Sequence, residues 1–232
     1  AISAHEEKMT QLETDRRANF EKWIRSEEYI DVVNSPIPRR DLNAFYNFDD
    51  GTLRNRINSK DAGVMKQLSG VEDAVFEKKA DGKVLVLNGD AWLDLNKVGI
   101  FRRSEPFTVG ISVNIPIDLS EGVIFHKSIA ERLYNFRGFH LYLKNGKLEL
   151  SMAHTAPSNA ITKTTKLDVP RDRWIQLTAT YDGSSKANGL KLFMDGEEVS
   201  MKTEIDQLTK DILFRTDYEP GLQIGAWDRG FG

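Results

Sequence analysis

The chain has 232 residues, which is enough for one large domain or two small ones. Its 32 basic and 35 acidic residues give a net charge of −3, so the sequence lacks the basic footprint of a nucleic-acid-binding protein. It contains no cysteine, which excludes disulfides, thiolate metal sites and cysteine nucleophiles. No apolar run approaches the roughly 18 residues that a membrane-spanning helix needs, and we expect no membrane insertion.

The first segment, residues 1–34, is predicted to be a helical leader or connector. Met9, Leu12 and Phe20 recur at roughly helical spacing among charged residues, and Pro36 ends the pattern. Two interpretations stay open. The helix either leans on its own domain as a linker, or forms a coiled coil that binds a partner.

From about residue 42 the apolar residues recur with a period of two. Apolar and polar residues alternate in 107–115, 175–181 and 190–194, as they do in strands with one buried face. Asn145-Gly146 is typical of a two-residue hairpin turn, because glycine supplies the positive φ that such turns require. Many short strands with turn signals and no intervening helices predict an all-β, antiparallel β-sandwich.

Six short motifs then follow one another in a characteristic order. They are FYNFDDGT, VLVLNGDAWLDL, FTVGISVNI, RWIQLTATYDGSS, LKLFMDGEEV and LQIGAWDRGF. In this order they resemble the concanavalin A-like, laminin-G-like sandwich family over about residues 42–231. The details EGVIFHK and VPRDRW are similar to a subgroup inserted in large bacterial extracytoplasmic proteins that also carry cytochrome-c-like domains.

This resemblance implies a concanavalin A-like jelly roll over residues 41–232, after the leader helix. It also implies a non-catalytic module that binds carbohydrate or neighbouring domains of the same polypeptide, in an extracytoplasmic location. The family continues after the R-G-F motif with one more strand, and this chain stops at Gly232, so we expect the sandwich to lack that strand. The alternatives are a structural or protein-interaction domain without a sugar ligand, and a glycan hydrolase.

Hydrolases related to this fold carry an E-x-D-x-x-E strand. Glu204 and Asp206 begin that pattern here, but Leu208 and Thr209 stand where the second glutamate is needed. Retaining hydrolysis requires two carboxyl groups about 5–5.5 Å apart. We therefore expect no catalysis, and we expect residues 201–212 to form a loop with a helical turn.

Asp49 and Asp50 form an acidic pair at the end of the first predicted strand. Ca²⁺ binds several carboxylate and carbonyl oxygens, which an adjacent aspartate pair and its loop can supply. The resemblance implies the same ion, because laminin-G-like domains often hold a structural calcium. The alternative is a plain acidic turn in which aspartate binds its own backbone.

Aromatic side chains bind sugars when they are exposed, because a pyranose has an apolar face that stacks on a ring. Trp227 lies beside charged residues at a loop edge and is the best stacking candidate. Trp92 alternates with leucines, which puts it on a polar or partly open face. Trp174 is expected in the core.

Strand parity around the Asn145-Gly146 turn points to a ligand pocket. Leu143 is expected opposite Leu148, and His154 then emerges at the rim of the sandwich. Loops on a rigid scaffold commonly carry binding function. We predict that five residues converge on one pocket for sugar hydroxyls or an acidic group, the alternative being that they are scattered around the rim: His126, Arg137, His154, Asn159 and Trp227.

Overall fold

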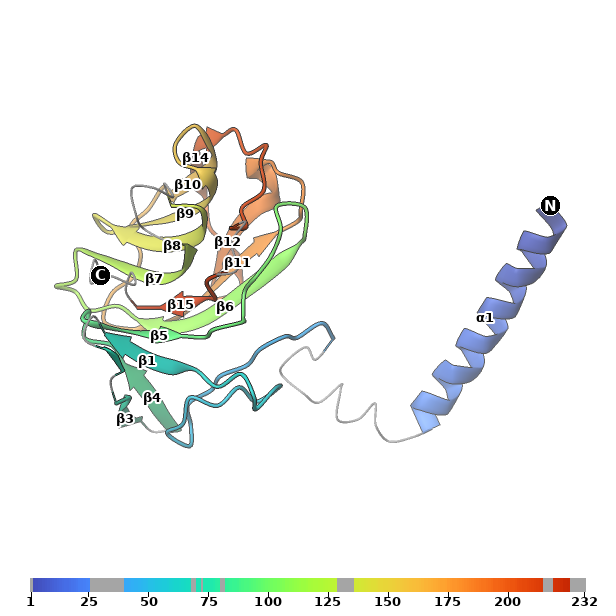
Figure 1. The fold of residues 1–232 in the computed structure, drawn as a ribbon, viewed down its shortest axis with the longest axis horizontal. Coiled ribbons are helices and arrows are strands. Elements are labelled where there is room, and N and C mark those ends of the chain that lie inside the picture. Colours follow the sequence, from blue (N-terminus) through green and yellow to red (C-terminus); the bar gives the residue numbers. More distant parts are fainter. Residues whose placement is uncertain are drawn as a thin grey trace. The chain divides into compact units, whose positions relative to one another are not determined.

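The computed structural model describes residues 2–25, 40–67, 70–71, 73–79, 82–128, 136–214 and 219–225. The chain divides into two units, Ala1–Asn43 and Ala44–Gly232. In the first unit, α1 (Ile2–Arg25) is an α-helix, which confirms the predicted helix (Figure 1). Lys22 and Arg25 lie in its last turn, where positive charges interact favourably with the helix dipole. Within the described residues, no helix combines the length and the apolar character needed to cross a membrane.

The second unit is an antiparallel β-sandwich, as predicted (Figure 1). Within the described residues, its larger sheet has nine strands in the order β14-β10-β9-β8-β7-β15-β5-β1-β2. In chain order these are β1 (Val64–Gln67), β2 (Gly70–Val71), β5 (Ala91–Asp94), β7 (Glu121–Ser128), β8 (Gly138–Lys144), β9 (Lys147–Thr155), β10 (Asn159–Thr165), β14 (Met201–Asp206) and β15 (Gln223–Ile224).

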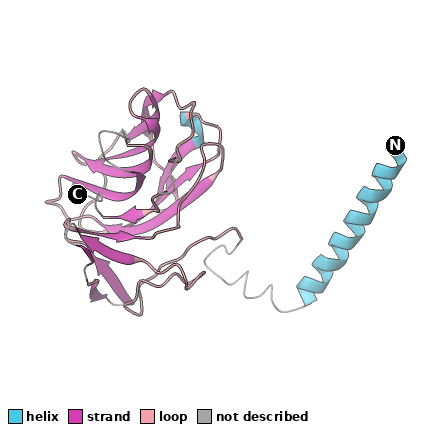
Figure 2. Cartoon of the chain, in the orientation of Figure 1, coloured by secondary structure: helices cyan, strands magenta, loops and turns pink. Residues whose placement is uncertain are grey.

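The second layer, in the part of the chain that the structure describes, is a four-stranded sheet in the order β13-β12-β11-β6 (Figure 2). Its strands are β6 (Phe107–Asn114), β11 (Trp174–Tyr181), β12 (Leu190–Met194) and β13 (Glu197–Glu198), with a short 3₁₀ helix, η1 (Ala187–Gly189), before β12. β3 (Val75–Lys79) and β4 (Gly82–Val86) pair with each other in a separate antiparallel sheet.

The core lies between the two layers. Phe125, Leu141 and Leu150 from the larger sheet and Leu177 and Leu192 from the smaller one are almost completely buried. Each such side chain contributes about 1.5–3 kcal/mol by leaving water. The alternation of these apolar residues along the strands thus produces the two-layer fold.

The β8–β9 hairpin confirms the predicted register. Leu143 pairs with Leu148, and the turn residues Asn145 and Gly146 have φ values of 50° and 80°. Both positive values fit the turn that joins two right-twisted strands through two residues.

Two segments differ from the sequence expectations. The first predicted strand, which was to end at Asp49 and Asp50, does not form. Phe45 instead makes hydrogen bonds with the following loop: its N–H donates to Asn55 Oδ1 (3.1 Å) and its oxygen accepts from Arg56 N (2.8 Å). Residues 201–206 are strand β14 rather than a loop. Their pairing with β10 is a long-range contact that the local sequence pattern does not show.

Candidate functional site

Arg137 and His154 meet where β8 begins and β9 ends. Arg137 donates from Nε to the backbone oxygen of His154, and its Nη2 lies 3.1 Å from His154 Nε2. His154 Nδ1 lies 2.6 Å from the backbone oxygen of Asp211, which can only accept a hydrogen bond. The proton of His154 is therefore on Nδ1, and Nε2 accepts from Arg137.

Asn159, at the start of β10, makes hydrogen bonds with the residues just before Asp211. Its Oδ1 accepts from the backbone N–H groups of Thr209 (3.2 Å) and Lys210 (3.1 Å), and its Nδ2 donates to Thr209 Oγ1 (2.7 Å). His154 and Asn159 thus use their hydrogen-bonding groups to hold residues 209–211 against β9 and β10.

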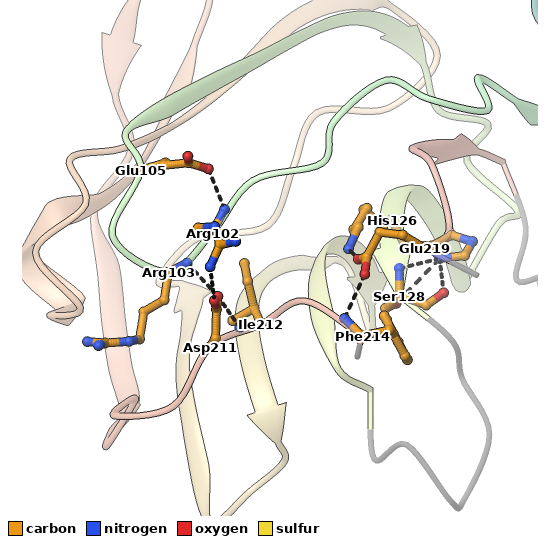
Figure 3. A network of polar contacts seen from close by, with 10 residues as sticks. Arg102, Arg103, Glu105, His126, Ser128, Asp211, Ile212, Phe214 and Glu219 are labelled. Atoms are coloured by element: carbon orange, nitrogen blue, oxygen red, sulfur yellow. Dashed lines mark hydrogen bonds and ion pairs between the residues drawn. The ribbon is translucent and has the colours of Figure 1, made fainter. Parts of the chain in front are cut away.

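His126 does not join these residues. It pairs with His140 across β7 and β8, whereas its neighbour Phe125 packs in the core, so alternation places His126 on the opposite face of the sheet. It is fully buried, and its Nδ1 contacts the backbone oxygen of Ser128 (Figure 3). The predicted convergence on one pocket is therefore wrong for His126. Trp227 lies outside the described residues.

The face of the nine-stranded sheet that points away from the core carries a row of polar side chains, which we call the polar face. Cross-strand pairing places each member beside the next, from β10 to β5. All six residues are buried, unlike polar residues on a solvated sheet. The row consists of Thr162, Ser151, His140, His126, Gln223 and Asp94.

Several members of the polar face have partners. His140 Nε2 lies 3.1 Å from Glu149 Oε1, and this bond is the main cause that lowers the pKa of Glu149. Asp94 accepts from Asn96 N (2.7 Å) and pairs with Lys66 Nζ (2.5 Å). Glu149 and Asp94 therefore each have a polar partner on this face.

Two groups of this face have no hydrogen-bond partner within the described part of the chain: Trp92 Nε1 and Gln223 Oε1. Trp92 is 4% exposed and Gln223 is 3% exposed. A buried polar atom without a partner costs about 1–3 kcal/mol. Gln223 pairs with Asp94, two residues beyond Trp92, so the donor and the acceptor are diagonal neighbours on one face.

The tryptophans differ in part from expectation. Trp92 lies on a polar face as predicted, yet it is buried. Trp174, expected in the core, is 45% exposed, because Ile175 takes the core-facing position at the start of β11.

The carboxylates of the broken hydrolase pattern have other roles. Glu204 pairs with Lys202 (2.8 Å), and Asp206 Oδ1 accepts from the backbone N–H of Ala187 (2.9 Å). Each of the two carboxylates thus contacts a different partner.

At the acidic pair, both oxygens of Asp50 are engaged. Its Oδ1 accepts from Thr52 Oγ1 (2.7 Å), which is the main cause that lowers its pKa, and its Oδ2 lies 2.9 Å from Arg56. Asp49 accepts from Asn47 Nδ2 (2.5 Å). The described residues contain no group of three acidic or histidine side chains able to hold a metal, so calcium here needs backbone oxygens as well.

Lys127 is a buried charge that sequence reasoning missed. It pairs with Phe139 of β8, so its side chain lies on the core face, and it is 0% exposed. Its ammonium group forms an ion pair with Glu219 and lies 5.4 Å from the ring centre of Phe214. Burial lowers the pKa of Lys127 to about 7, and the charge of Asp211 opposes this shift. Glu219 also accepts from Phe214 N (2.8 Å; Figure 3).

No curated protein sequence matches this chain. Among solved structures, it is similar to domain 4 of AbnA, a GH43 extracellular arabinanase from Geobacillus stearothermophilus, in complex with arabinotriose. The identity is 16%, the TM-score is 0.52, and the match covers 78% of this chain and 88% of that one.

Mouse laminin alpha1 domains LG4-5 (12% identity, TM-score 0.35) and the botulinum neurotoxin serotype D ligand binding domain in complex with N-acetylneuraminic acid (17%, 0.46) also match. The matches cover 71% and 77% of this chain, but only 33% and 41% of theirs.

The model of the Laminin_G_3 family, described as the concanavalin A-like lectin/glucanases superfamily, matches residues 87–220. That range is more than half of the chain and includes most strands of both sheets. The chain belongs to the concanavalin A-like lectin/glucanases superfamily.

Proposed function

We propose that the sandwich is a non-catalytic carbohydrate-binding module whose ligand lies on the polar face. The observation that carries the proposal is that Trp92 Nε1 and Gln223 Oε1 are buried and have no hydrogen-bond partner within the described residues. Both atoms are buried in the free protein, so a ligand must displace the atoms that cover them. A sugar hydroxyl accepts one hydrogen bond and donates another, so a polyhydroxy ligand that does so meets both needs. Lys66, Tyr142 and Glu149 on the same face are partly exposed and offer further polar contacts.

The fold supports this proposal, because the arabinanase domain with the same fold was solved with arabinotriose. We further propose that the module is part of a larger extracytoplasmic bacterial protein of the subgroup with cytochrome-c-like domains. The sequence details EGVIFHK and VPRDRW support that assignment.

The test compares two matched tryptophan variants on an array of arabino-, gluco- and galacto-oligosaccharides. Trp92→Phe keeps an aromatic ring but removes the unmatched N–H, and we expect about tenfold weaker binding, equivalent to about 1.4 kcal/mol. Trp174→Phe makes the same change at an exposed site on the other sheet and should bind like the wild type.

Two results would contradict the proposal. Equal binding by Trp92→Phe and wild type would exclude the polar face as the site. No binding to any glycan would favour the structural or protein-interaction alternative.

The proposed module hydrolyses no glycan, because Glu204 and Asp206 lack a second glutamate and are tied to local partners. Incubation with β-1,3 and β-1,4 glucans should release no reducing sugar above a buffer blank. Release that Glu204→Gln abolishes would establish the hydrolase alternative instead.

A further inference from the structure

The polar face crosses a narrow point of the sheet at β15. This strand has two residues, Gln223 and Ile224, and lies between β7 and β5. Through two residue pairs on each side, it joins β5, β1 and β2 to the other strands of the nine-stranded sheet. The place of Gln223 in the polar row therefore depends on how this short strand is held.

Backbone contacts fix the chain just before β15. Leu222 N donates to Val98 O (2.8 Å), and Leu222 O accepts from Leu95 N (2.9 Å). At Gly221 a Cβ atom would lie 1.3 Å from the backbone oxygen of Asn96, so the two segments touch closely there. These contacts join the segment to the β5 side of the sheet.

The ion pair of Lys127 with Glu219 joins the same segment to the β7 side. Glu219 lies four residues before Gln223, and Lys127 directly follows His126, the residue that pairs with Gln223. Lys127 points to the core face and His126 to the polar face, so the ion pair and the ligand face are on opposite sides of the same two strands.

A buried ion pair is weak evidence of a gain in stability. Two charges lose their hydration on burial, and their attraction often fails to offset that cost. The best-attested role of a buried polar or charged group is to fix the register of packed elements.

We propose that the Lys127–Glu219 ion pair is a latch that holds β15 in register and so positions Gln223 for the ligand of the polar face. The part that concerns the ligand rests on the proposed function, whereas the holding of β15 does not. The latch also responds to pH, because Lys127 loses its charge as the pH rises through about 7. The charged and titratable groups around Lys127 are Glu219, Asp211, Arg137 and His154. Arg137 lies near the same Phe214 ring as Lys127, and His154 contacts Arg137.

The test replaces both partners at once, which avoids leaving one charge alone. In the variant Lys127→Met/Glu219→Gln, the glutamine still accepts from Phe214 N. The matched control is Lys191→Met/Glu198→Gln, which removes a partly exposed ion pair (2.9 Å) from β12 and β13 of the other sheet.

Hydrogen exchange of the Gln223 and Ile224 amides is the first readout. We expect about tenfold faster exchange in the latch variant, with β11 amides unchanged and the melting temperature equal or higher. The second readout is the affinity for the oligosaccharide that the wild type binds best on the array. We expect about tenfold weaker binding at pH 6, and we expect the fall in wild-type affinity from pH 6 to pH 9 to disappear in the variant.

The two claims fail in different ways. If β15 amides exchange as in the wild type, the latch is overturned whatever the affinity shows. If the wild type binds no oligosaccharide but these amides exchange faster in the variant alone, the latch stands and the proposed function fails.

Discussion

The two faces of the nine-stranded sheet are built from the same strands but hold their residues in different ways. On the core face, Phe125, Leu141 and Leu150 are buried by packing against the second sheet. On the polar face, His126 and Gln223 are buried as deeply, yet the face includes hydrogen-bonding groups without partners in the described chain.

The difference shows that burial alone does not identify a core. An apolar side chain gains free energy when it leaves water, whereas a polar one loses free energy unless it finds a partner. A buried polar row with unmet hydrogen bonds is therefore costly for the free protein, and a ligand that completes those bonds would recover the cost.

The largest expected effect tests the core face. Leu141→Ala leaves a cavity at a fully buried position and should lower the free energy of unfolding by about 2–5 kcal/mol. Ser151→Ala on the polar face removes a hydroxyl bonded to Ile161 O and Thr162, and should cost about 1 kcal/mol. Urea unfolding of both variants measures the difference, and similar costs would break the comparison.

A glycine at the junction of the sheet gives the next effect. In Gly221→Ala the new methyl group collides with the backbone of Asn96, so we expect a loss of about 1–3 kcal/mol. The control is Gly110→Ala in β6, where a Cβ atom would lie 3.4 Å from Gln176 Nε2, an ordinary contact. Thermal unfolding should separate the two variants, and an undisturbed Gly221→Ala would show that the approach to β15 is loose.

Lys127 is a charged residue on the otherwise apolar core face, and its lowered pKa predicts how the free energy of unfolding depends on pH. Its folded-state pKa is about 7 and its ordinary value is 10.5, so between these values the unfolded chain binds more protons than the folded one. The contribution of Lys127 to the free energy of unfolding therefore increases from pH 7 to pH 10.5. The variant Lys127→Met/Glu219→Gln lacks this increase, so its stability relative to wild type should fall over this range. A constant difference across the range would refute the lowered pKa.

The smallest effect concerns the acidic turn outside both faces. If Asp49 and Asp50 bind calcium as the sequence and the family resemblance predict, EDTA should lower the melting temperature, because an ion bound only by the folded state stabilises it. The variant Asp49→Asn/Asp50→Asn should not respond to EDTA. A wild-type melting curve that EDTA leaves unchanged would support the plain turn, in which Asp50 bonds Thr52 and Arg56.

The sequence predicted what depends on local periodicity. Alternating residues predicted the strands β6, β11 and β12, and the Asn145-Gly146 turn predicted the β8–β9 register. Residues 201–206 were missed as a strand because polar residues dominate them, and only pairing with β10 makes them β14.

The polar face could not be assembled from the sequence in the same way. Its centre depends on the pairing of β15 with both β5 and β7. β15 and β5 are more than a hundred residues apart in the sequence. The irregular register between Val123 and Phe125 also breaks simple alternation in β7. His126 was therefore expected at the rim with His154, and Lys127 was not expected inside.

The central claim is that the polar face binds sugar, and the indole N–H of Trp92 reports on it directly. In a ¹H–¹⁵N NMR titration with the best-binding oligosaccharide, the Trp92 indole signal should shift strongly while the exposed Trp174 indole stays in place. Saturation of that shift at the affinity found on the array is the predicted result. Binding that leaves the Trp92 signal unmoved and shifts residues of β6 or β11 instead would contradict the account.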